Sequence, residues 1–368
     1  MNADTARVDT EFSLDDKIVI NAMGGLSDPN QPPKQEADGA TSDGGHLPAD
    51  ISLRGIADAR LGGLTTTHIT VGHVFGGTDP YGTTVAEVAQ WTAEIAAHPD
   101  ALLLVRSAAD IRRAKAESKI GVMLGFQNLE MLGDDVSRVD QFAEAGVSVF
   151  QLTYNGPNAL GGGSLTPGDT GLTRFGRDVI ERLNARKVVV DLSHSAEQTC
   201  LDALDVATAP IAITHTGCRA LTDLPRNKSD AELRRVAERG GFVGIYFMPF
   251  LAIGRNATGD DIVAHIEHAI DVCGEDCVGI GTDSSLTALD DMDAFRRNFA
   301  QEIDARRKAG ISAAGEEADI MPFAIDMTGP RQLIDLANRL ARRGHSERRI
   351  DGILGQNFLR YVGEIWGR

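Results

Sequence analysis

Short runs of apolar and β-branched residues recur along the chain, separated by stretches in which apolar residues return every three or four positions. Runs of the first kind predict strands, and spacing of the second kind predicts helices. We expect strands at residues 17–21, 64–72, 120–127, 148–154, 187–194, 210–216, 241–247 and 277–283. Helices are expected at residues 134–146, 171–187, 195–207, 229–240 and 260–274, and several of them end on glycine or a basic residue.

This alternation of strands and helices predicts parallel pairing, and the nearly continuous apolar strands indicate that both of their faces are covered. Eight units over this length favour a closed (β/α)8 barrel of the TIM type over an open doubly wound sheet. The segment after the first strand also lacks the G-x-G-x-x-G fingerprint of a dinucleotide site. We expect an N-terminal extension over residues 1–16 and one barrel domain over 17–368, with C-terminal helices from about residue 327 closing the barrel.

The composition and net charge of the chain restrict the kinds of partner that it can bind. The chain of 368 residues carries a net charge of −17, which argues against nucleic acid or an anionic membrane as a partner. No apolar run is long enough to span a membrane, and the first 16 residues lack a secretory pattern. We therefore expect a cytoplasmic protein that binds a small molecule or a second copy of itself. Four scattered cysteines are too few for a disulfide framework.

In a barrel of this type, the chemistry lies where the strands end, beneath the loops that lead into the helices. We expect the polar segments 27–48, 160–171 and 283–299 to be such loops around the mouth. The side chains at the ends of the predicted strands are those of Asn21, His73, Gln127, Tyr154, His194, His215 and Asp283.

Three of these side chains form a recognisable set. His194 and His215 end successive strands, so their imidazoles would stand side by side within reach of one metal ion. Asp283 would face them across the mouth, where it could coordinate the metal or take a proton from a metal-bound water. Asp191, three residues before His194, is expected to steady its surroundings by hydrogen bonding and not to bind metal.

Several segments resemble those of the membrane (renal) dipeptidase family, peptidase family M19 of the amidohydrolase superfamily. They are DLSH (191–194), ITHTGCRALTDLPRN (213–227), HIEHAIDVCGEDCVGIGTD (265–283) and ILGQNFLRYVGEIWG (353–367), together with residues 121–135 and 150–164. The resemblance covers the chain from residue 17 onward. It implies a (β/α)8 barrel, usually dimeric, with a binuclear zinc site that hydrolyses dipeptides and, in some members, β-lactams.

Carried over by position, the resemblance assigns roles to four residues. His194 and His215 match the two histidines of the second metal site, and Asp283 matches the catalytic aspartate. Arg226 matches the arginine that holds the substrate carboxylate, a role that suits the fork of a guanidinium group.

The departures from the family pattern are as informative as the matches. Met23 and Gly25 stand where the family has the His-x-Asp pair of the first metal site, and Gln127 stands at the bridging glutamate. Tyr154 replaces a substrate-contacting histidine. Because the missing ligands are concentrated in one site and the bridge, we expect one zinc ion at most, or none, held by His194 and His215 with Gln127 or water.

Two other histidines, His46 and His73, are placed where they could try to rescue the first metal site, although we expect His73 to line the mouth and His46 to lie in an exposed loop.

Three functions remain open. The first is a mononuclear amidohydrolase that cleaves an amide bond in a small carboxylate-bearing substrate, with weak dipeptidase activity or none. Asp283 and Tyr154 would act in catalysis, and Arg226, Tyr154, Asn21 and His73 would contact the substrate. The second is lyase, decarboxylase or isomerase chemistry on the same scaffold, and the third is a non-catalytic protein that binds small carboxylates. The resemblance favours the first function and a homodimer.

Overall fold

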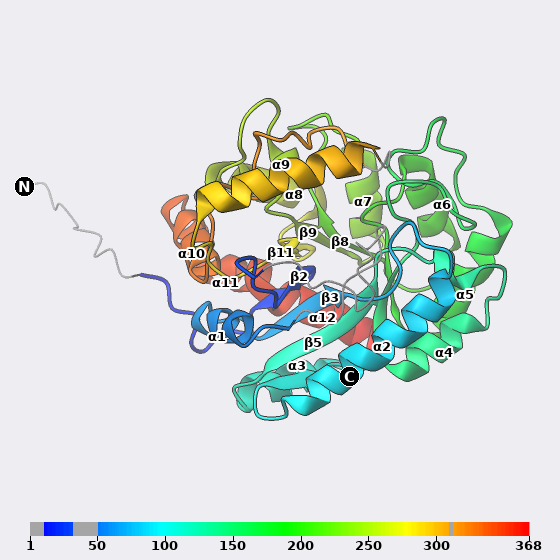
Figure 1. Ribbon diagram of the computed structural model, residues 1–368, viewed down its shortest axis with the longest axis horizontal. Helices are drawn as coiled ribbons and strands as arrows, with labels where there is room; N and C mark the ends of the chain where they lie inside the picture. The colour runs from blue at the N-terminus through cyan, green and yellow to red at the C-terminus, as the bar shows by residue number, and fades with distance from the viewer. Residues whose placement is uncertain (1–10, 32–50, 309–311, 368) are drawn as a thin grey trace, which may run out of the picture.

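Eight parallel strands form the central barrel of the computed structural model, which describes residues 11–31, 51–308 and 312–367. Seven of them lie within the strands expected from the sequence and the eighth, at Val147–Gln151, begins one residue earlier than expected, so the (β/α)8 barrel is confirmed (Figure 1). In order around the barrel they are β1 (Ile20–Asn21), β3 (Thr66–Thr70), β5 (Ile120–Phe126), β6 (Val147–Gln151), β7 (Val189–Asp191), β8 (Ala212–Thr216), β9 (Phe242–Ile245) and β10 (Val278–Ile280).

Helices surround the strands, and each of the five expected helices is present, four with shorter bounds and the one expected at 260–274 shifted by one residue. The helices of the described residues are α1 (Leu53–Leu61), α2 (Pro80–Ala97), α3 (Ala108–Ala116), α4 (Arg138–Ala145), α5 (Arg174–Arg186), α6 (Glu197–Val206), α7 (Asp230–Glu238), α8 (Gly259–Cys273), α9 (Met292–Lys308), α10 (Gln332–Arg342), α11 (Glu347–Asp351) and α12 (Asn357–Trp366). None of them is both long and apolar enough to cross a membrane. A short extra strand, β4 (Leu102–Leu104), pairs with β5 outside the closed path.

The prediction of a loop at residues 283–299 is wrong, and the loop predicted at residues 27–48 falls largely outside the described residues. The segment 283–299 contains the start of α9, which begins at Met292. Its apolar residues at three- and four-residue spacing include Phe299 and Ile303, which are buried against Met321 in a small cluster of their own. Most of the segment 27–48, including His46, lies outside the described residues.

The barrel closes at a seam between its first and last strands. The Ala22 backbone N–H donates to the Ile280 carbonyl at 3.0 Å, and the side chain of Asn21 bonds Thr282 twice. Its Nδ2 donates to Thr282 Oγ1 at 2.8 Å, while its Oδ1 accepts from the Thr282 backbone N–H at 2.8 Å. Just beyond the seam, β2 (Gly24–Gly25) pairs in parallel with β11 (Ser284–Ser285). The amide of Asn21 is therefore used in joining the two edges of the barrel.

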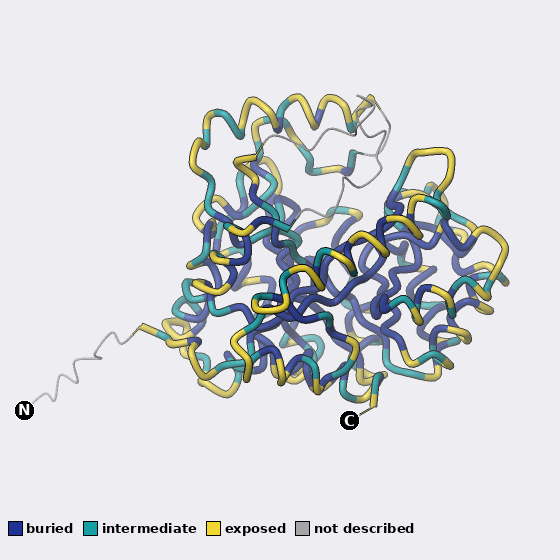
Figure 2. The backbone as a smooth tube through the Cα atoms, turned by 60° about the horizontal axis from the view of Figure 1, so that its bottom comes forward, coloured by how far each residue is buried: buried dark blue, intermediate teal, exposed yellow. Residues whose placement is uncertain are grey.

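The C-terminal helices close the opposite end of the barrel. A π-helical turn, η3 (Gly352–Gln356), leads into α12, and Phe358 of α12 packs edge-to-face on Phe242 of β9 with ring centroids 4.9 Å apart. Figure 2 shows the buried backbone gathered in the centre of the molecule, with exposed segments around it. The polar side chains that could take part in chemistry therefore lie at the other end of the barrel, where the strands finish.

Because the amide of Asn21 satisfies a buried N–H of Thr282, the Asn21→Ala variant should lower the free energy of unfolding by about 1–3 kcal/mol. Urea unfolding measures this change. Gln198→Ala is the matched control, since that exposed amide bonds only Asp202 one helical turn away on the surface. Equal stability of the two variants would contradict a closing role for Asn21.

Candidate active site at the mouth of the barrel

His194 follows β7 and is held by the segment before it. The Asp191 carboxylate accepts from the Ser193 hydroxyl at 2.6 Å and from the Ser193 backbone N–H at 3.0 Å, which fixes the turn into His194. His194 Nδ1 lies 2.7 Å from Asn155 Oδ1, an oxygen that can only accept a hydrogen bond. Nδ1 therefore carries the proton, and Nε2 of this neutral imidazole presents a lone pair to the mouth.

His215, at the end of β8, is oriented by the same carboxylate. The Thr214 hydroxyl donates to Asp191 Oδ2 at 2.6 Å and lies 2.9 Å from His215 Nδ1. Because the single hydroxyl hydrogen is directed to Asp191, the bond to His215 must be donated by Nδ1–H. His215 Nε2 then also carries a lone pair. The expected hydrogen-bonding role of Asp191 is thereby confirmed.

The two Nε2 atoms converge. They lie 3.0 Å apart, with both imidazoles almost fully buried and the ring centroids 5.0 Å from each other. Burial, helped by the nearby Arg226 guanidinium, holds the pKa of both histidines well below 6.5. Two neutral imidazoles with facing lone pairs, each fixed at Nδ1, form the kind of donor pair that a metal ion uses.

Arg226 lies directly against this pair. Its Nη2 donates to His194 Nε2 at 2.9 Å, and its Nη1 donates to the Ser193 carbonyl at 2.8 Å. The side chain is buried, and the guanidinium lies 6.0 Å from the ring centroids of both Tyr246 and Phe250. A permanent positive charge is thus held beside the imidazoles, where it supplies hydrogen-bond donors for an anion.

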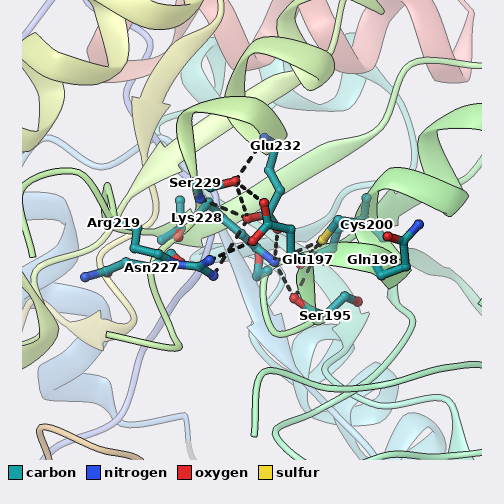
Figure 3. A network of polar contacts seen from close by, with 12 residues as sticks. Ser195, Glu197, Gln198, Cys200, Arg219, Asn227, Lys228, Ser229 and Glu232 are labelled. Carbon is teal, nitrogen blue, oxygen red and sulfur yellow. Dashed lines mark hydrogen bonds and ion pairs between the residues drawn. The ribbon is translucent and has the colours of Figure 1, made fainter. Parts of the chain in front are cut away.

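A buried lysine two residues after Arg226 anchors the same segment (Figure 3). Lys228 Nζ contacts the Ser195 carbonyl, lies 3.0 Å from Cys200 Sγ, and pairs with Glu232 Oε1 at 3.1 Å. Glu232 is itself fully buried on α7. Because Ser195 directly follows His194, this network fixes the position of the histidine segment relative to the arginine segment.

Tyr154 covers the imidazole pair from the side of β6. Its ring stacks on His194 with centroids 4.3 Å apart and an interplanar angle of 22°, and its other face meets Phe75 at 5.8 Å. Burial raises the pKa of the Tyr154 hydroxyl, which therefore remains a hydrogen-bond donor at neutral pH. The positive charge of Arg306, from the last turn of α9, acts electrostatically on this tyrosine.

Asp283 lies across the mouth at the end of the closing strand. Its backbone has a φ of +58°, which is uncommon for a residue with a side chain, and is held there by a 2.9 Å bond from its N–H to the Met23 carbonyl. Burial raises the pKa of its carboxyl group from 3.8 to about 6, although Arg226 and Arg306 act to lower it. A carboxylate that titrates just below neutral pH is suited to general-base work.

The position of the first metal in the family pattern is filled by neutral groups. Met23 is buried, and its Sδ accepts from Gln127 Nε2 and from the Thr70 hydroxyl, both at 3.6 Å. Gln127 is therefore placed against the methionine, and no contact with the imidazole pair is seen within the described residues. The part of the chain that the structure describes also contains no cluster of three or more His, Cys, Asp or Glu side chains able to hold a metal ion.

Two other expected site residues have different partners. His73 is buried beyond β3, and its Nε2 lies 3.1 Å from Glu130 Oε2 in the short helix η1 (Glu130–Leu132). Asn21 is bonded to Thr282 at the seam. The structure thus brings His194, His215, Arg226 and Tyr154 into contact, places Asp283 within the electrostatic influence of Arg226, and leaves these two residues in separate contacts.

Sequence reasoning missed three residues of the site. Asn155 fixes the tautomer of His194, and its only signal was its place directly after a strand-end residue. Arg306 and its partner Glu316 were missed because they lie on α9 and the segment that follows it, distant in sequence from the histidine motifs. No local pattern connects such residues to the mouth.

The chain is similar to known proteins over most of its length. The model of the membrane dipeptidase family, peptidase family M19, matches residues 68–306. An uncharacterized protein in the pqqA 5′ region of Klebsiella pneumoniae is 30% identical over 276 residues, covering 72% of this chain and 89% of that protein. An uncharacterized dipeptidase of Schizosaccharomyces pombe is 36% identical over 172 residues, covering 45% of this chain and 41% of that protein.

A solved structure extends the similarity to the whole fold. The crystal structure of an amidohydrolase from Pseudomonas aeruginosa superposes with a TM-score of 0.78 at 29% sequence identity, covering 96% of this chain and 98% of that one. The family match spans well over half of the sequence and includes His194, His215 and Asp283. The chain therefore belongs to the membrane dipeptidase family, peptidase family M19.

Proposed function

We propose that this protein is a mononuclear, metal-dependent hydrolase that cleaves an amide bond in a small substrate bearing a carboxylate. Membership of peptidase family M19 supports a metal-dependent hydrolase. The finer proposal rests on one observation, the convergence of the His194 and His215 Nε2 atoms to 3.0 Å with both Nδ1 atoms fixed by hydrogen bonds.

These residues fit one cation better than two. His194 and His215 would hold a zinc ion through their Nε2 atoms, which lie 3.0 Å apart. Gln127 is directed to Met23 and away from this pair. A second dication would require anionic ligands near the first, and the corresponding positions hold Met23, Gly25 and Gln127.

The surrounding side chains supply the remaining chemistry. A zinc ion would polarise the scissile carbonyl and lower the pKa of a bound water. Asp283, ionised above its pKa of about 6, takes the proton from the attacking water. Tyr154, which keeps its own proton, donates a hydrogen bond to the oxygen on which negative charge develops. Arg226, once His194 no longer accepts its Nη2–H, turns that donor to the substrate carboxylate.

One contact favours a second candidate function, a protein that binds small carboxylates without hydrolysing them. Arg226 already satisfies the lone pair of His194, so its positive charge stands where a cation would otherwise be. In this alternative, the guanidinium and Tyr154 hold an anion, and no metal is needed. Metal content and turnover distinguish the two functions. The homodimer expected from the family resemblance stays a prediction.

The first test is the metal content of protein purified without added metal. We expect close to one zinc ion per chain, and loss of at least nine-tenths of it in His194→Ala, because two protein ligands are too few to spare one. Inductively coupled plasma mass spectrometry gives the number of zinc ions per chain. Hydrolysis is assayed with a panel of dipeptides and N-acyl amino acids as substrates.

His268→Ala is the control for this experiment, since that histidine pairs with Asp230 on the outer helices. It should retain its zinc. Two ions per chain in the wild type would contradict the mononuclear proposal, and metal-free protein that binds carboxylates without turnover would favour the second candidate.

The second test restores the missing ligands. The triple variant Met23→His, Gly25→Asp, Gln127→Glu should raise the zinc content from one ion toward two and increase dipeptide turnover by at least tenfold. A β-carbon on Gly25 would meet no atom closer than 3.8 Å, so the backbone there accepts a side chain without a clash at Cβ. The single variant Gly25→Asp is the control and should leave the stoichiometry at one. A triple variant that folds and still binds one ion would contradict our account of the first site.

The third test concerns the pH dependence of stability in metal-free protein. Between pH 4 and 6, native Asp283 retains a proton that the unfolded chain has lost, so its contribution to stability falls as the pH rises through about 6. Asp283→Asn removes this dependence. Relative to wild type, the variant should gain about 2–3 kcal/mol in free energy of unfolding between pH 4 and 7.

Urea unfolding at several pH values in the presence of a chelator measures this difference. Asp290→Asn is the control of opposite sign, because Arg54 lowers the pKa of that exposed carboxyl group. Parallel pH profiles for wild type and Asp283→Asn would show that burial does not shift this carboxyl group.

A further inference from the structure

Helix α9 brings a second guanidinium to the mouth of the barrel. The helix is anchored on its own small apolar cluster, in which Phe299 and Ile303 pack against Met321. Most of its outer residues are exposed (Figure 2). The side chain of Arg306 in the last turn is only 19% exposed. An arginine is costly to bury without partners, so its contacts indicate its role.

One edge of the Arg306 fork is fixed by Glu316. Nε donates to Glu316 Oε2 at 3.1 Å and Nη2 donates to Oε1 at 2.9 Å, which is a bidentate pair. The same carboxylate accepts from the Ser312 hydroxyl at 3.0 Å and from the Ala313 backbone N–H at 3.2 Å. Of the five N–H groups of the arginine, two are used here, and the others remain for Tyr154 and the mouth.

The two arginines lie on either side of the same aromatic stack. Arg306 acts electrostatically on Tyr154, the Tyr154 ring stacks on His194, and Arg226 donates to the far nitrogen of that imidazole. Both guanidinium groups also act electrostatically on Asp283. A ligand bound beside Tyr154 and His194 would therefore lie between two guanidinium groups.

The carboxylates at the mouth neutralise the two arginines only in part, so a further anionic group can be accommodated there. Glu316 is already paired with Arg306, and the positions that carry metal-binding carboxylates in the family pattern hold Gly25 and Gln127. Among the described carboxylates, Asp283 is one on which both Arg226 and Arg306 act electrostatically. A substrate with a single carboxylate would occupy one guanidinium and leave the other without an anion from the ligand.

We propose that Arg306 is a specificity-determining residue and that the substrates are small dicarboxylates, with one carboxylate on Arg226 and the second on Arg306. This inference rests on the proposed function and narrows its substrate class to amides whose products include an acidic amino acid or a similar diacid. Specificity then comes from an arginine on α9 and not from the histidine segments.

The test compares ligands that differ in one charge. Succinate and succinamate, and glutarate and glutaramate, have the same length, but the second of each pair has one carboxylate replaced by an amide. Isothermal titration calorimetry on the whole chain should show at least one diacid binding tenfold more tightly than its monoamide. Arg306→Gln should weaken the diacid tenfold and change the monoamide less than twofold.

Arg307→Gln is the matched control. It removes the same charge from the next residue, whose side chain is 45% exposed and pairs with Glu317 at 2.7 Å. It should leave both affinities unchanged. The double variant Arg306→Gln, Glu316→Gln removes the pair together, so that no buried carboxylate is left unpaired if the single variant fails to fold.

The proposal is overturned if wild type binds diacid and monoamide equally or binds neither. It also fails if Arg306→Gln weakens both ligands alike, or if Arg307→Gln reproduces its effect. Hydrolysis of Gly-Asp against Gly-Asn separates this proposal from the proposed function. Diacid-selective binding without turnover would defeat the function alone, whereas turnover of both dipeptides with equal kcat/KM, unchanged in Arg306→Gln, would defeat the role of Arg306 alone.

Discussion

The carboxylate of Asp191 is the constraint on which the site depends. It accepts four hydrogen bonds, two from Ser193 and two from Thr214, and so ties together the ends of β7 and β8 where the backbone ladder pairs only at Asp191 and Ala212. Each of these partners immediately precedes a histidine, so one buried charge orients both imidazoles. A buried carboxylate is stable only when its acceptors are satisfied in this way.

Electrostatics then determines what the imidazole pair can bind. Burial keeps both histidines neutral, and Arg226 reinforces this by standing 2.9 Å from His194 Nε2. The neutral Met23 and Gln127 remove the negative charge that would stabilise two dications, and the guanidinium of Arg306 adds positive charge from another direction. Loss of carboxylates and gain of arginines both favour an anionic ligand over a second metal ion.

Helix α9 shows where local reasoning ends. The segment before it, residues 283–291, follows a strand, and its aspartates, serines and threonine read as a loop. The helix is stabilised by apolar contacts with Met321, which lies well beyond it in sequence. Arg306 reaches Tyr154 because of that packing. Likewise, the amide of Asn21 looked available for a substrate until closure of the barrel placed Thr282 against it.

The sequence by itself determined the eight strands, most of the helices around them, and the side chains that finish the strands, because hydrophobic periodicity is a local property of the chain. It also indicated that His194 and His215 stand side by side, since successive strands of a parallel barrel are neighbours. Only the tertiary structure decided the tautomers of these histidines, the partners of Asn21 and His73, and the entry of Arg306. Those depend on contacts between residues far apart in sequence, which no local pattern records.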